Sequence, residues 1–110
     1  MMKKIEISQI YETISVLKKK IRTSENYWKY ISETKHPDLK NKLEDVLEAL
    51  NKADEVWQNP EAKDFYLYYC KINKYWICVI ARHLNGDGFI ITAYLTSKSK
   101  RKGKLIWQKK

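Results

Sequence analysis

Residues 88–96 read GFIITAYLT, and this stretch decides the fold because it is the clearest β-strand in the chain. It follows Asn85-Gly86-Asp87, which is a strong signal for a tight turn. Side chains of a strand alternate between the two faces of a sheet. One face of this strand is therefore apolar, and the other carries the hydroxyl groups of Thr92 and Tyr94. These hydroxyls are candidates for a polar site; the alternative is an ordinary half-buried strand in which Thr and Tyr serve only as β-formers.

Four further strands are predicted in the second half of the chain, where turn signals separate runs of β-formers. They cover residues 55–58, 65–72, 75–84 and 104–107. Residues 75–84 consist almost entirely of β-formers, which is typical of a central strand. Residues 88–96 should pair with them through the tight turn, so the second half predicts an antiparallel meander.

The first half predicts helices. Apolar residues recur at helical spacing in residues 10–21 and favour a helix over about residues 8–18, although residues 17–22 also suit a short strand. Thr23 or Ser24 is a good N-cap for a helix that ends near Lys35. His36 precedes Pro37 and should lie at a break between helices. A long amphipathic helix then runs to about residue 53.

These elements predict a single α+β domain over residues 1–110, with N-terminal helices packed on one face of a four- to five-stranded antiparallel sheet. Residues 1–22 form an N-terminal extension, residues 23–53 the helical part and residues 55–107 the sheet.

Charge is distributed unevenly along the chain. The formal net charge is +9, and the only acid after Phe65 is Asp87, against ten basic residues. A basic surface of this kind favours a polyanionic partner, most commonly nucleic acid, over a surface kept only for solubility. The expected RNA-binding residues follow the Gly88–Thr96 strand, in a basic loop and the first residue beyond it: Lys98, Lys100, Arg101, Lys102 and Lys104.

No metal site or cofactor is expected. The sequence contains no P-loop, no dinucleotide-binding glycine pattern and no His/Cys spacing suited to zinc. Cys70 and Cys78 are interpreted as core residues. The first residues lack the apolar run of a signal peptide and no stretch is long enough to span a bilayer, so we expect a cytoplasmic protein without a membrane partner.

The strand register yields a hypothesis for the site. If residues 85–87 form a three-residue loop, Cys78 lies opposite Tyr94, Ile80 opposite Thr92 and Arg82 opposite Ile90. Arg82, Thr92 and Tyr94 then share the face that the helices leave open, and His36 and Lys35 at the helix break complete a metal-free set.

This set suits RNA cleavage through the 2′-hydroxyl. His36 would act as acid or base, Lys35 and Arg82 would hold the phosphate, and Thr92 and Tyr94 would donate to the transition state. The alternative for His36 is a loop or capping residue.

Two blocks of the sequence resemble a known group of proteins. They are Thr23-x4-Trp28-x2-Ile31-x4-His36-Pro37-x-Leu39 and residues 88–95, followed by Gly103 and Trp107. The chain resembles the small phage and bacterial nucleases of the barnase–EndoU–colicin–RelE-like superfamily. The resemblance implies a metal-independent endoribonuclease that is toxin-like and acts on tRNA or mRNA, with a cognate antitoxin or immunity protein as a further partner. It carries over His36, Lys35, Thr92 and Tyr94 but not Arg82.

Two other functions remain open. One is a non-catalytic RNA-binding module, in which the aromatic residues Tyr66, Tyr68, Trp76 and Tyr94 would stack bases. The other is a protein-interaction domain with no nucleic-acid partner, which salt-dependent binding would distinguish from the first two functions.

Overall fold

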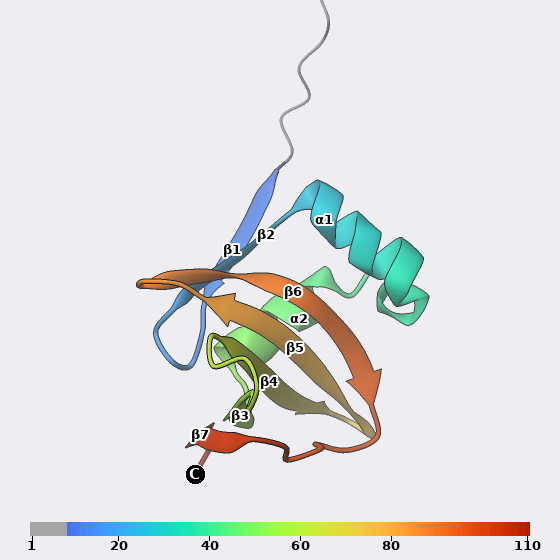
Figure 1. Cartoon of the computed structure of the whole chain (residues 1–110). Coiled ribbons are helices and arrows are strands. Elements are labelled where there is room, and N and C mark those ends of the chain that lie inside the picture. The colour runs from blue at the N-terminus through green and yellow to red at the C-terminus, as the bar shows by residue number, and fades with distance from the viewer. Residues whose placement is uncertain (1–8) are drawn as a thin grey trace, which may run out of the picture.

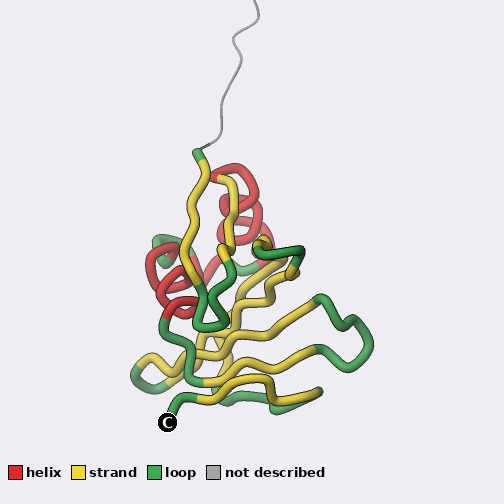
Figure 2. Tube along the Cα trace, turned by 90° about the vertical axis from the view of Figure 1, so that its left-hand side faces the viewer, coloured by secondary structure: helices red, strands yellow, loops and turns green. Residues whose placement is uncertain are grey.

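The computed structural model describes residues 9–110 and contains a seven-stranded sheet with helices on one side (Figures 1 and 2). The strand order is β1-β2-β6-β5-β4-β3-β7. The strands are β1 (Ile10–Ile14), β2 (Lys20–Ser24), β3 (Glu55–Gln58), β4 (Phe65–Ile72), β5 (Tyr75–His83), β6 (Asp87–Thr96) and β7 (Lys104–Gln108). The helices are α1 (Glu25–Lys29), the π-helical η1 (Tyr30–Lys35), the 3₁₀-helical η2 (Pro37–Leu39) and α2 (Leu43–Asn51).

The predicted fold class is wrong in two respects. The sheet has seven strands rather than four or five. It is also mixed, because β2 and β6 pair in parallel while all other neighbouring strands of the sheet pair antiparallel. The described chain also contains only two short α-helices, of five and nine residues, in place of an N-terminal helical layer.

The helix predicted over residues 8–18 is the source of this error. Residue 8 lies outside the described residues, and residues 10–24 form the β1–β2 hairpin. Lys18 has a positive φ of 64° in its turn, and Ser15 Oγ accepts hydrogen bonds from the backbone of the same turn. Ile10 and Ile14 share the exposed face of β1, and Leu17 lies in the turn. Only Ile21 is fully buried, beside Gly88 of β6, so the apolar spacing did not mark one face of a helix. The segment classed as an N-terminal extension is part of the sheet.

The helix start and the break were predicted correctly. Ser24 caps α1, and its Oγ accepts a hydrogen bond from the Tyr27 backbone N–H at 3.1 Å. His36 has φ −138° and ψ 77°, so it separates η1 from η2 as expected for a residue before proline. The long helix predicted after Pro37 is broken, because Asn41 adopts a positive φ of 65° between η2 and α2.

The meander of β3, β4, β5 and β6 and the presence of β7 agree with the prediction. The predicted register holds for two pairs, Cys78 with Tyr94 and Ile80 with Thr92. A bulge then follows, so Arg82 lies opposite Phe89 instead of Ile90. The bulge reverses which side chains of β6 point to the core, from Ile91 back toward the turn. Ile90, only 1% exposed, therefore points to the core, where Phe89 and Ile91 were predicted to point.

The core lies between one face of the sheet and the helices. It combines Val46 and Leu50 of α2 with Val79 of β5 and Ala93 of β6. In Figure 1, α2 lies behind the strands, so the opposite face of the sheet is turned toward the viewer. We call this opposite face the site face.

The connection between β6 and β7, residues 97–103, carries the predicted basic loop. It leads from β6 to β7 at the far edge of the sheet, and Gly103 ends it with φ 97°. A Cβ at Gly103 would overlap the Gln58 carbonyl oxygen, so only glycine fits there. Within residues 9–110, no helix is long and apolar enough to cross a membrane.

Candidate functional site

A row of side chains crosses the site face at right angles to the strands. Its members are Glu55 of β3, Tyr69 of β4, Cys78 of β5 and Tyr94 of β6, which are paired in succession. Adjacent strands lie about 4.8 Å apart, so the row spans roughly 14 Å. The candidate site is built around its Tyr94 end.

His36 reaches this row from the helical part of the chain. Its ring centroid lies 6.1 Å from that of Tyr94, with the planes tilted by 38°. The break before Pro37 positions the imidazole, because the backbone N–H of His36 closes η1 on Ile31 and its carbonyl accepts from Leu39 in η2. The structure therefore brings together the two residues that were predicted to share a site, from positions 58 residues apart in the sequence.

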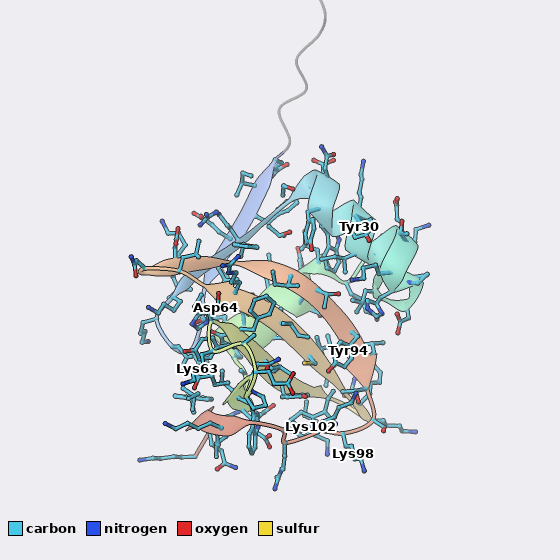
Figure 3. The ribbon with its side chains drawn as sticks, in the orientation of Figure 1. Tyr30, Lys63, Asp64, Tyr94, Lys98 and Lys102 are labelled. Atoms are coloured by element: carbon cyan, nitrogen blue, oxygen red, sulfur yellow. The ribbon has the colours of Figure 1, made fainter. Side chains whose placement is uncertain are left out.

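The basic loop runs along the same row. Lys100 Nζ lies 5.7 Å from the centroid of the Tyr94 ring, which is within cation–π distance. Lys98 and Lys102 lie below Tyr94 in Figure 3. All three lysines are exposed, so the site is bordered by free positive charge.

Glu55 holds the loop in this position. It is only 5% exposed, and its carboxylate accepts hydrogen bonds from Trp57 Nε1 at 2.8 Å and from Ser99 Oγ at 2.8 Å. The Arg101 guanidinium lies 3.5 Å from its second oxygen. Arg101 is therefore committed to an ion pair, unlike the other predicted RNA-binding residues of the loop.

Burial keeps three groups of the row, Tyr69, Cys78 and Tyr94, in their neutral forms. It raises the pKa of Tyr94 well above its usual range, and the Cys78 thiol and the Tyr69 phenol beside it add to this effect. Burial likewise raises the pKa of Tyr69 to about 12 and that of Cys78 to about 11. Tyr94 is thus a proton-bearing hydrogen-bond donor at neutral pH, and Cys78 is an inert thiol, not a nucleophile. Both cysteines are free and buried, as predicted.

Thr92 lies on the site face, but its hydroxyl is not exposed. It is opposite Ile80, two residues from Tyr94, and its Oγ1 is buried without a hydrogen-bond partner. A buried hydroxyl without a partner lowers the stability of the fold, and a bound ligand that accepts a hydrogen bond from Thr92 would remove this cost.

Arg82 and Lys35 are less closely connected with the site than the sequence suggested. Arg82 Nε donates to Asp64 at 2.7 Å, and this ion pair lowers the pKa of Asp64. Arg82 is four residues from Cys78 along β5, or about 13 Å from the row. Lys35 is exposed at the end of η1.

Only part of the predicted base-stacking surface is available. Tyr68 is fully buried on the core face, and Tyr66 stacks on His83 with centroids 3.9 Å apart. Trp76 remains partly exposed on the site face, with Lys71 Nζ 6.0 Å from its ring. Of the four residues predicted to stack bases, Trp76 and Tyr94 are therefore the two that remain available on this face.

A polar network surrounds His83, and it was not predicted from the sequence. The Tyr68 hydroxyl lies 2.8 Å from His83 Nε2 and 2.9 Å from Ser15 Oγ. Burial, together with the positive charge of Lys19, lowers the pKa of His83 to about 4, so the imidazole is neutral. The sequence did contain a signal for this network: Tyr66 and Tyr68 are two residues apart on β4, so their phenol groups lie on the same face of the sheet.

Among residues 9–110, no group of three or more His, Cys, Asp or Glu side chains is placed to hold a metal ion. Comparison of the chain with protein-family models, curated proteins and solved structures found no match.

Proposed function

We propose that this protein is a toxin-like, metal-independent endoribonuclease of the cytoplasm whose active site lies at the Tyr94 end of the site face. The observation that carries the proposal is the position of His36 beside Tyr94, with Lys100 over the same ring. An imidazole, a neutral phenol and a free cation are groups that suit cleavage through the 2′-hydroxyl. The resemblance of the two sequence blocks to the barnase–EndoU–colicin–RelE-like superfamily supports the same activity.

The roles follow from the chemistry of each group. His36 takes the proton of the 2′-hydroxyl or returns one to the leaving 5′-oxygen. Tyr94 donates a hydrogen bond to a non-bridging oxygen, because its raised pKa keeps the phenol protonated. Lys100, with Lys98 and Lys102, attracts the RNA backbone. Thr92 contributes only if the bound phosphate reaches its buried hydroxyl.

The alternative is an RNA-binding module that does not cleave. The ion pair of Arg82 with Asp64 and the burial of the Thr92 hydroxyl favour it, because they leave fewer groups free for catalysis. In this case Trp76 and Tyr94 stack bases under the basic loop.

Incubation of the purified protein with total RNA in EDTA tests the proposal. We expect discrete cuts with 2′,3′-cyclic phosphate ends, and a loss of about 10²- to 10⁴-fold in rate for His36→Ala, the usual contribution of acid–base catalysis. RNA affinity should change little in this variant. RNA that stays intact but binds in a salt-sensitive way would support the binding module, and a His36→Ala protein as active as the wild type would refute the role of His36.

Lys100→Ala tests the RNA-binding part, with Lys20→Ala as a charge-matched control on β2. Each phosphate contact to single-stranded RNA contributes about 0.7 to the slope of log affinity against log salt. Lys100→Ala should reduce this slope by about that amount, and Lys20→Ala should not. Co-expression with genes encoding small acidic proteins, scored by relief of growth arrest, tests for a cognate antitoxin or immunity protein.

A further inference from the structure

A cavity of about 350 Å³ opens where β2 and β6 separate. The two strands pair in parallel over a short ladder, in which Lys20–Arg22 of β2 lie opposite Asp87–Phe89 of β6. After this ladder the chain turns into α1, and the space left beside β6 is lined by residues of both segments. A volume near the lower end of the usual range for ligand sites, roughly 300–1,000 Å³, suits a small flat group.

The walls of the cavity are apolar and aromatic. Tyr27 of α1 and Phe89 of β6 line it, together with Ile10. Tyr27 is 38% exposed and Ile10 is 54% exposed, so both present apolar surface to solvent. The Tyr27 ring is fixed in place, because its hydroxyl donates to the Ile91 carbonyl at 2.6 Å.

A polar group without a partner belongs to the cavity wall, just beneath its surface. Thr23 lines it and is only 5% exposed, and its Oγ1 is buried without a hydrogen bond. The nearby Arg22 is already committed, since its Nη1 lies 2.6 Å from Asp87 and 3.5 Å from the Gly88 carbonyl. A ligand with a hydrogen-bonding edge would satisfy the Thr23 hydroxyl, which a purely apolar ligand would leave unpaired.

The position of the cavity connects it with the candidate site. The hydrogen bond of Tyr27 ends on Ile91, the neighbour of Thr92, and Tyr94 follows three residues after Ile91. At about 3.3 Å per residue, this separation along β6 is roughly 10 Å. A nucleotide next to the one bound at Tyr94 is therefore within reach of the cavity.

We propose that this cavity accepts one unpaired nucleobase of the bound RNA, stacked on Tyr27 and read by the Thr23 hydroxyl. This inference rests on the proposed function, because it assumes that an RNA strand is bound on the site face. It makes the cavity the element that determines base preference. Unpaired bases are recognised in this way in general, by aromatic stacking and hydrogen bonds to their edges.

The test measures binding of eight-nucleotide oligonucleotides to the full-length protein. The 2′-O-methyl oligomers of A, C, G and U cannot be cleaved through the 2′-hydroxyl, and a fully abasic oligomer carries the same charge. Tyr27→Leu should weaken binding of the base-containing oligomers about tenfold and leave the abasic oligomer unchanged, because it removes the stacking ring. Thr23→Val should reduce the differences among the four bases. The matched controls are Tyr75→Leu on β5 and Thr13→Val on β1, because neither residue lines the cavity.

The outcomes separate this inference from the proposed function. If the wild type binds RNA but both cavity variants bind all oligomers as it does, the cavity does not hold a base, and the proposed function is unaffected. If no oligomer binds in a salt-sensitive way, both proposals are refuted. A readout on the wild type covers variants that fail to fold: the backbone amide signals of Thr23 and Tyr27 should shift with the base-containing oligomers and not with the abasic one. The absence of such shifts overturns the inference.

Discussion

Replacement of Glu55 by alanine is the perturbation whose effect follows most directly from the structure. Its buried carboxylate accepts hydrogen bonds from Trp57 and Ser99 and pairs with Arg101. Ser99 and Arg101 belong to the basic loop, so this one side chain connects the loop to β3. The variant should therefore affect both the stability of the fold and the position of the loop lysines.

The magnitude follows from the individual contacts. A hydrogen bond to a charged group contributes about 1.5–3 kcal/mol, and two such bonds in one cluster are not fully additive. The pair with Arg101 adds at most about 1 kcal/mol, because the Arg101 side chain is 66% exposed. We expect Glu55→Ala to lower the free energy of unfolding by about 3 kcal/mol. With a urea dependence of about 1.5 kcal/mol per molar, the unfolding midpoint falls by about 2 M.

Urea titration followed by tryptophan fluorescence measures this change, and RNA affinity measures the position of the loop. The control is Glu61→Ala, which removes the same charge from an exposed position. Loss of one negative charge alone should strengthen RNA binding, so weaker binding by folded Glu55→Ala indicates a displaced loop. A midpoint within about 0.3 M of the wild type would refute the anchoring role of Glu55.

Two further predictions concern stability. Gly103→Ala should destabilise the fold by more than about 1 kcal/mol, because the added Cβ meets the Gln58 carbonyl at a positive φ. The control is Gly86→Ala, which should destabilise the fold less because its added Cβ meets no atom within 4 Å. Equal urea midpoints for the two variants would contradict this explanation. The pKa of His83 is about 4 in the folded protein and about 6.5 when unfolded, so the unfolded chain binds the proton more tightly. The resulting stability is fully present above pH 6.5 and is lost as the pH falls through 4; it amounts to about 3 kcal/mol. In His83→Gln this part of the acid sensitivity should be missing from urea titrations between pH 7.5 and 4, and an unchanged pH dependence would show that His83 is not its source.

The strands of the second half could be predicted because their sequences allow few alternatives. Residues 65–72 and 75–83 are long runs of β-formers between turn signals, and tertiary packing had no competing preference to overcome. In residues 10–21, by contrast, the spacing of apolar residues suited a helix as well as a hairpin. The outcome there depends on the parallel pairing of β2 with β6, which no local pattern reveals.

The candidate site was predictable only in part. Tyr94 was placed opposite Cys78 correctly, and the break at His36 brought the imidazole to it. The bulge on β6 was not predictable, because it depends on two parts of the β5–β6 hairpin at once. The turn before Asp87 sets the register at one end, and the pairs near Tyr94 set it at the other. Arg82 was expected to be free, but Asp64, in the connection before β4, neutralises it.

The distance of His36 from Tyr94 along the chain affects when the site forms during folding. Contacts between residues far apart in the sequence require closure of a long loop, and they form late compared with local turns and hairpins. The meander can assemble from neighbouring strands, whereas the pairing of imidazole and phenol requires the helical part to dock on the completed sheet. A partly folded chain therefore contains each of these groups but no assembled site, and whatever chemistry the site performs is reserved for the native state.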